Sequence, residues 1–152
     1  MKDSTFLNRN EIEIINRLPD AQFKNFCFTF FESLGLSNTE SFSVQQPGCV
    51  TGRGTIELGI VMTYRFVFLG KQHAGVISEQ VIQELRDLME SKTNKGLIMT
   101  TGSFSRQAKR QAKSKGKVPI DLFDRNAIIY KLENMKLRIS PETGKVFKDN
   151  TE

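Results

Sequence analysis

The spacing of apolar residues predicts two helices at the start of the chain. A short helix is predicted over Asn10–Arg17 (NEIEIINR). A longer one is predicted from Asp20, which can cap its amino end, to Leu34, where Gly35 ends it. We expect this second helix to face the core with a stripe of residues spaced three and four apart: Phe23, Phe26, Cys27, Phe30, Phe31 and Leu34.

Beyond Gly35 the pattern changes to an alternation of apolar and polar positions, which is typical of β-strands. A weak strand is predicted over Ser41–Gln45. Stronger strands are predicted over Thr55–Met62 and Tyr64–Leu69. The two stronger strands are expected to form a hairpin that turns near Thr63.

From Ser78 onward, helical and strand patterns alternate. The predicted elements are a helix beginning at Ser78, a strand over Gly96–Thr101, a basic helix capped by Ser103 or Ser105, a strand over Val118–Phe123, and a helix from Asp124 to about Leu137. Counted from Asp20, the order is α-β-β-β-α-β-α-β-α, which predicts an α/β fold with a mixed central sheet flanked by helices. One domain over residues 1–137 is expected, followed by a polar C-terminal tail over 138–152.

Composition narrows the class of protein. The chain has 152 residues, of which 38% are hydrophobic, and this is enough for one domain with its own core. Its two cysteines, Cys27 and Cys49, exclude a disulfide framework and a four-thiolate zinc site, so we expect a reducing, cytoplasmic location. No apolar run is long enough to span a bilayer, so no membrane partner is expected.

Charge is distributed unevenly along the chain. Residues 1–90 carry 8 basic and 11 acidic residues, whereas residues 91–152 carry 14 basic and 6 acidic ones. The densest stretch, Ser105–Lys117 (SRQAKRQAKSKGK), has six cations and no acid. Such a stretch suits a polyanion such as nucleic acid, although an ordinary solvated helix face has the same composition.

A carboxylate and a lysine stand out on the predicted hairpin. Glu57 lies in its first strand, and Lys71 lies just beyond the second. A hairpin can bring these two side chains to one end of the sheet. There a carboxylate would hold Mg²⁺ and a lysine would stabilise a phosphate that is being attacked. Taken alone, the same two residues could equally be ordinary solvent-exposed side chains, a glutamate at a strand edge and a lysine in a turn.

Several segments together match the pattern of a known family. They are Phe23–Gly35, Gly52–Glu57, Leu69–Lys71, Lys95–Ala108 (KGLIMTTGSFSRQA) and Ile120–Asp124 (IDLFD). On these residues the chain resembles the Mrr-type branch of the PD-(D/E)XK nuclease superfamily, over roughly residues 20 to 137. The resemblance implies a restriction endonuclease-like fold with a core order α-β-β-β-α-β, and here an extra helix-strand-helix at the C-terminal end.

The resemblance also implies a metal site and shows where this chain departs from it. Glu57 stands where the family has an aspartate, and Leu69 stands where it has glutamine or glutamate. Glu57 and the carbonyl of Gly70 would hold Mg²⁺ or Mn²⁺, and Lys71 would be the catalytic lysine. Some members of the superfamily supply a missing acid from the next helix, and here Glu84 or Glu79 would do so.

A DNA-binding surface is expected around this site. Thr101, Ser103 and Ser105 lie between a predicted strand and the start of the basic helix, where hydroxyls and free N–H groups can hold a phosphate. The same residues also suit plain helix capping. Further candidates for DNA contact are Arg53, Gln72, His73, Arg106, Lys109, Arg110 and Lys113.

Two functions from different classes follow. The first is a DNA-binding, metal-dependent endonuclease of restriction or defence type, acting on double-stranded DNA. The alternative is a catalytically degenerate DNA-binding or scaffolding subunit with the same fold. An RNA-processing domain on this fold is a third possibility. A homodimer or a partner subunit is also expected, since cutting two strands needs two sites.

Overall fold

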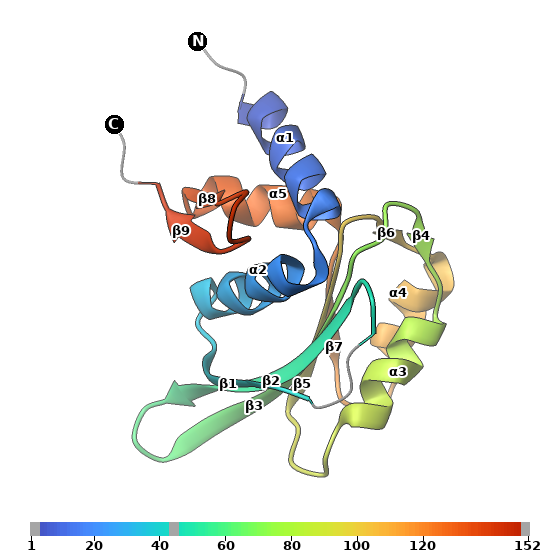
Figure 1. The fold of residues 1–152 in the computed structure, drawn as a ribbon. Coiled ribbons are helices and arrows are strands. Elements are labelled where there is room, and N and C mark those ends of the chain that lie inside the picture. The colour runs from blue at the N-terminus through green and yellow to red at the C-terminus, as the bar shows by residue number, and fades with distance from the viewer. Residues whose placement is uncertain (1–3, 43–45, 150–152) are drawn as a thin grey trace.

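The protein folds around a five-stranded mixed sheet with helices on both faces (Figure 1). The structure, a computed structural model, describes residues 4–42 and 46–149. The helices are α1 (Ser4–Arg17), α2 (Asp20–Ser33), α3 (Gln80–Leu88), α4 (Arg106–Ala112) and α5 (Arg125–Asn134). The strands are β1 (Ser37–Ser41), β2 (Cys49–Leu58), β3 (Met62–Lys71), β4 (Val76–Ile77), β5 (Lys95–Thr100), β6 (Ser103–Phe104), β7 (Ile120–Phe123), β8 (Leu137–Ile139) and β9 (Val146–Lys148).

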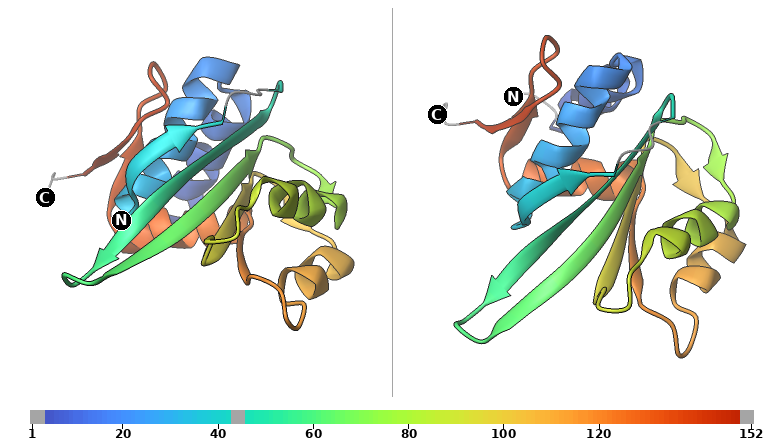
Figure 2. Two further views of the ribbon diagram at one scale, coloured as in Figure 1. Left: turned by 90° about the horizontal axis from the view of Figure 1, so that it is seen from below. Right: turned by 60° about the horizontal axis from the view of Figure 1, so that its bottom comes forward.

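The central sheet has the order β1-β2-β3-β5-β7. Its first three strands are antiparallel, whereas β3, β5 and β7 run parallel to one another. The right-hand view of Figure 2 shows the long β2–β3 hairpin extending past the other strands. This arrangement confirms the expected α/β fold with a mixed sheet flanked by helices.

Two hydrophobic layers hold the helices to the sheet. On one face, the phenylalanines of α2 pack with Phe66 and Phe68 of β3 and with α5. On the other face, α3 and α4 pack on Val67 and Leu69 of β3. Successive residues of β3 therefore serve opposite layers, as the two-residue period of a strand requires. The predicted stripe of α2 does form core, with Phe26, Cys27, Phe30 and Phe31 all fully buried.

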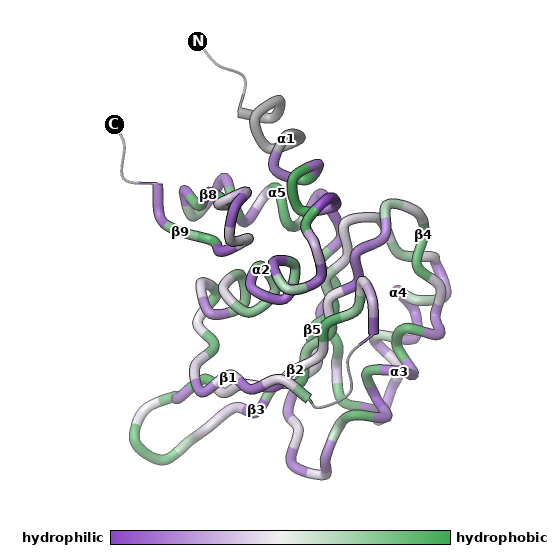
Figure 3. The backbone as a smooth tube through the Cα atoms, viewed as in Figure 1, coloured by the Kyte–Doolittle hydropathy of each residue, from purple (hydrophilic) through white to green (hydrophobic). Residues whose placement is uncertain are grey.

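The turn of the β2–β3 hairpin lies earlier than expected. Strand β2 ends at Leu58 and β3 begins at Met62, so the turn consists of Gly59, Ile60 and Val61 rather than residues near Thr63. Gly59 has a φ of 71°, which glycine adopts at little cost. Ile60 and Val61 are fully exposed at the tip, which appears as an apolar stretch of tube in Figure 3.

Strand β1 also lies away from its predicted position. The expected strand over Ser41–Gln45 corresponds to β1 only at its first residue, and residues 43–45 lie outside the described part of the chain. β1 instead covers Ser37–Ser41 and has no buried residue. An edge strand without a buried face leaves no apolar alternation for a sequence pattern to detect.

The segment expected as a polar tail forms a hairpin instead. Strands β8 and β9 pair between Leu137 and Lys148, and residues 150–152 lie outside the described part of the chain. Ile139 is buried, and its N–H donates to the buried carboxylate of Glu11 on α1 at 3.1 Å. The N–H of Val146 donates to the Thr29 hydroxyl of α2 at 2.9 Å. These anchors lie far away in sequence, which is why local composition did not reveal the hairpin.

Among the residues that the structure describes, no helix has both the length and the apolar character needed to cross a membrane.

Candidate functional site

The carboxyl ends of β3 and β5 meet at one edge of the sheet, and Lys71 lies there. Lys71 pairs with Thr100 across the parallel ladder, and its carbonyl accepts a hydrogen bond from the N–H of Thr101 at 3.3 Å. Its ammonium lies 3.7 Å from a carboxylate oxygen of Glu84 on α3. The structure therefore brings together two of the three predicted catalytic side chains.

The third, Glu57, lies at the opposite end of the hairpin. It pairs with Thr63 next to the tip and accepts a hydrogen bond from the Thr63 hydroxyl at 2.9 Å. Lys71 instead pairs with Cys49, and the eight residue steps from 49 to 57 span about 26 Å of strand. The expectation that the hairpin brings Glu57 to Lys71 is therefore wrong.

The position of the turn explains this error. A turn near Thr63 would have placed Glu57 opposite Leu69 and beside Lys71. The turn at Gly59–Val61 shifts every partner toward the start of β2, so that Cys49 lies opposite Lys71 and Thr51 lies opposite Leu69. Strand register follows turn position, and a small displacement of the turn moves every pair along the hairpin.

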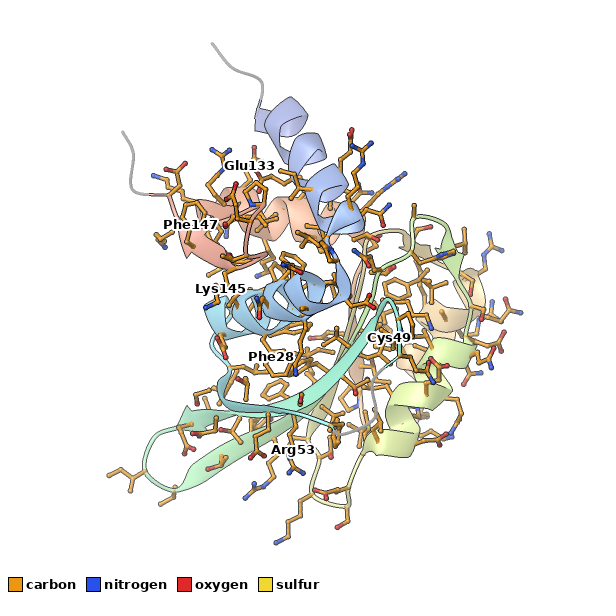
Figure 4. The ribbon with its side chains drawn as sticks, in the orientation of Figure 1. Phe28, Cys49, Arg53, Glu133, Lys145 and Phe147 are labelled. Carbon is orange, nitrogen blue, oxygen red and sulfur yellow. The ribbon has the colours of Figure 1, made fainter. Side chains whose placement is uncertain are left out.

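The residues that do surround Lys71 on β2 and β3 are not carboxylates. Cys49, Thr51 and Leu69 line a hollow against α3, and the carboxylates of this hollow, Glu84 and Asp87, both come from α3. Leu69 is 1% exposed. Burial raises the pKa of the Cys49 thiol, with the Lys71 charge opposing this rise and the Glu84 charge adding to it. Cys49 is therefore a neutral thiol at neutral pH. Figure 4 labels this side chain where β2 begins, close to α3.

The strand positions beside Lys71 offer few ligands to a divalent metal of the Mg²⁺ class. Such ions take hard oxygen ligands, commonly one or two carboxylates together with the phosphates of the substrate. In the described part of the chain, no group of three or more His, Cys, Asp or Glu side chains could hold a metal ion. Gly70, whose carbonyl was expected to be a ligand, is buried inside the sheet between Val50 and Met99.

Two predicted DNA contacts instead hold the fold together. The side-chain amide of Gln72 donates to the carbonyls of Ile15 and Leu18 at 2.8 and 2.9 Å, where α1 ends. Thr101 is buried, and its hydroxyl donates to Asn16 at 2.9 Å and accepts from the N–H of His73. Thr101 thus has a structural role, whereas Gln72 is half-buried and also lines the hollow that contains Lys71.

The two serines before the basic helix both lie in structural elements. Ser105 caps α4, since its hydroxyl accepts from the N–H of Ala108 at 3.0 Å. Ser103 lies in β6, which pairs with β4 in a small parallel sheet that the sequence pattern did not reveal.

Arg53, another predicted DNA contact, lies next to Val67 on the hairpin, where it forms an ion pair with Glu40 at 3.0 Å.

The remaining predicted contacts are exposed, in two places. His73 follows Lys71 and lines the hollow that contains Lys71 and Glu84. Arg106 and Arg110 are exposed on α4. This helix begins next to the same hollow, because the N–H of Ser105 donates to the carbonyl of Ile77, which lines it. Lys109 and Lys113 line a different hollow, beside β7.

Comparisons with known proteins agree with this fold. A family model described as restriction endonuclease, Mrr_cat, matches residues 15–132. The DNA modification-dependent restriction endonuclease AspBHI is 15% identical, with a TM-score of 0.65 over 95% of this chain and 41% of that one. The MspJI restriction endonuclease, solved in complex with a 27-mer oligonucleotide, is 18% identical, with a TM-score of 0.57 over 87% and 31%.

The present chain thus spans less than half of either restriction enzyme. No curated protein matches it. The family match covers well over half of the chain and confirms the resemblance that the sequence motifs indicated. The chain belongs to the Mrr_cat restriction endonuclease family.

Proposed function

We propose that this chain is a DNA-binding domain of the restriction endonuclease family whose cleavage centre is degenerate. It would hold double-stranded DNA at the Lys71 end of the sheet and would not cut it unaided. The observation that carries this proposal is the register of β2 and β3, in which Cys49 lies opposite Lys71 and Thr51 opposite Leu69. A thiol, a hydroxyl and an apolar side chain thus lie where metal-binding oxygens would be needed.

Charge supports the DNA-binding part of the proposal. Lys71 lies at one hollow, and Arg106 and Arg110 are exposed on the neighbouring helix. Cations spread over such a surface can neutralise successive phosphates of a duplex. The family itself consists of restriction endonucleases, and the related MspJI was solved with an oligonucleotide.

The first experiment measures binding and cutting on the same protein. Binding of a labelled duplex, followed by fluorescence anisotropy, is expected to weaken steeply as salt is raised. Cutting of supercoiled plasmid is measured with Mg²⁺ and with Mn²⁺. Wild type is expected to cut no more plasmid than Lys71→Ala does, because neither protein has a working cleavage centre. Binding that does not depend on salt would contradict the proposal.

A restoration variant tests why cutting is absent. Cys49→Asp together with Leu69→Gln puts the two residue types that the family uses, an aspartate and a glutamine, beside Lys71. We expect this double variant to nick plasmid in the presence of Mg²⁺ or Mn²⁺, and the activity to disappear when Lys71→Ala is added. Leu69 is buried, so circular dichroism and a urea titration must first show that the double variant is folded.

A second candidate is metal-dependent cleavage by the wild-type chain, and the 3.7 Å contact between Lys71 and Glu84 favours it. In that case Glu84 would supply the acid from α3. Wild type would then nick plasmid, and both Glu84→Gln and Lys71→Ala would abolish the nicking. The same plasmid assay therefore separates the two candidates. A homodimer or a partner subunit that selects the site is compatible with either.

A further inference from the structure

Strand β7 forms one edge of the central sheet, and its outer side is open. Among the described residues, β7 pairs only with β5. The N–H of Gly96 on β5 donates to the carbonyl of Pro119 at 2.9 Å. In a parallel ladder the residues of a strand face the two sides in alternation, so Asp121 and Phe123 face β5. Ile120 and Leu122 therefore direct both N–H and C=O toward the open side.

A hollow runs along this open edge. It is lined by every residue from Ile120 to Asp124, whose side chains alternate between the two faces of the sheet. It therefore follows the strand edge itself, with α4 on one side and α5 on the other. Its apolar lining comes from Phe104 and Ala112 as well as from β7.

The charges that line the hollow indicate which kind of segment could bind there. Lys109 and Lys113 on α4 and Lys131 on α5 line it, and none forms an ion pair with a described residue. Its two carboxylates are already engaged. Asp121 pairs with Lys95 at 3.1 Å, and Asp124 accepts from the N–H of Ala127 at 2.9 Å. The hollow is thus cationic and complements acidic side chains.

We infer that the open edge of β7 is a docking site for an extended acidic segment of a partner protein. The segment pairs with Ile120 and Leu122 as an added strand, while its carboxylates meet Lys109, Lys113 and Lys131. Nucleic acid is a poorer match, because half of the outward backbone groups are carbonyls, which phosphate oxygens repel. This inference does not depend on whether the Lys71 end binds or cuts DNA.

The test uses an acetylated and amidated peptide, Glu-Val-Glu-Val-Glu-Val, as the probe. Fluorescence anisotropy is expected to show binding to the wild-type chain. The amide signals of Ile120 and Leu122 are expected to shift most in NMR titrations. The double variant Lys109→Glu/Lys113→Glu should bind at least about tenfold more weakly, because like charges then face each other. The matched control, Lys115→Glu/Lys117→Glu, changes the same charge just outside the hollow and should bind normally.

Backbone pairing is tested separately from charge. A peptide N-methylated at alternate residues keeps its carboxylates but cannot form a ladder, and it should not bind. Leu122→Pro removes an N–H on the open side of β7 and keeps the hydrogen bonds to β5. This variant should no longer bind the peptide. An unchanged circular dichroism spectrum shows that it is still folded.

Three results would overturn the inference. The first is that the methylated peptide binds as tightly as the unmethylated one. The second is that the control double variant loses as much affinity as Lys109→Glu/Lys113→Glu. The third is that a DNA duplex, but not the peptide, shifts the β7 signals. That result would assign Lys109 and Lys113 to DNA instead. Because duplex binding is measured on the same variants, failure here is distinguishable from failure of DNA binding at the Lys71 end.

Discussion

Gly70 lies on β3 directly beneath α2, at a point where the strand and the helix nearly touch. A Cβ atom at this position would collide with the Sγ of Cys27 and lie 3.4 Å from the Cε of Met99. We expect Gly70→Ala to lower the free energy of unfolding by about 1 to 3 kcal/mol, as overpacking of a core does. Urea titration measures this loss.

The control for this prediction is the double variant Gly70→Ala/Cys27→Ala. Removing the Cys27 sulfur opens the space that the new methyl group needs, so the double variant should lose less stability than the two single losses combined. Simple additivity would show that Cys27 is not the atom in the way.

Glu11 makes stability depend on pH. Burial raises the pKa of this carboxyl above its ordinary value, although Arg138 and the N–H of Ile139 partly oppose the rise. The folded protein therefore holds the proton more tightly than the unfolded chain does. The resulting stabilisation is complete below the ordinary glutamate pKa and is lost as pH rises through the raised pKa.

Denaturation curves between about pH 4 and pH 8 check this sign. The free energy of unfolding of wild type should fall across the window in which Glu11 ionises. Glu11→Gln cannot ionise and should lack that fall, while its other pH dependence stays the same. A variant that follows the wild-type curve throughout would show that Glu11 titrates normally.

At the scale of elements, helix caps give a local and measurable contribution. Asp124 caps α5 by accepting the N–H of Ala127 at 2.9 Å. Asp124→Ala should destabilise the protein by about 1 kcal/mol, because a backbone donor at the helix start loses its partner. Asp124→Asn keeps an accepting oxygen and should cost much less. Thermal or urea unfolding of the three proteins compares them directly.

The elements that depend on local signals were the predictable ones. The stripe of α2 and the caps at Ser105 and Asp124 follow from residues within one or two helical turns, and the structure has them where expected. The cap predicted at Asp20 is wrong, because Pro19 is the N-cap of α2 and no side chain caps that helix. Strand register does not follow from such signals. The misplaced turn of the β2–β3 hairpin made the motif residue Glu57 look close to Lys71 and hid the pairing of Cys49 with Lys71.

That hairpin contained a usable signal, since Gly59 has a positive φ and stands where the turn lies. Placing the turn at Gly59–Val61 rather than near Thr63 would have paired Cys49 with Lys71. The β8–β9 hairpin offered no comparable signal. Its strands have three residues each, and their burial comes from contacts with α1 and α2.

At the scale of the whole molecule, the question is whether DNA binding uses the positive charge at the Lys71 end of the sheet or the excess positive charge of the whole surface. Comparing a lysine at the Lys71 end with one on β9 answers it. Lys71→Ala should weaken duplex binding similarly for all sequences and reduce the slope of log affinity against log salt by about one. Lys148→Ala removes the same charge from exposed β9 and should leave both quantities unchanged. Anisotropy titrations at several salt concentrations measure them.

The hydrogen bond between Ile139 and Glu11 joins residues that are 128 positions apart. A ribosome adding roughly 5 to 20 residues per second needs about 6 to 26 seconds between these two residues. During that interval the Glu11 carboxylate has neither of its partners on β8 and remains in water. Final docking of the first helix must therefore wait for β8, which makes it one of the last steps in the folding of a newly made chain.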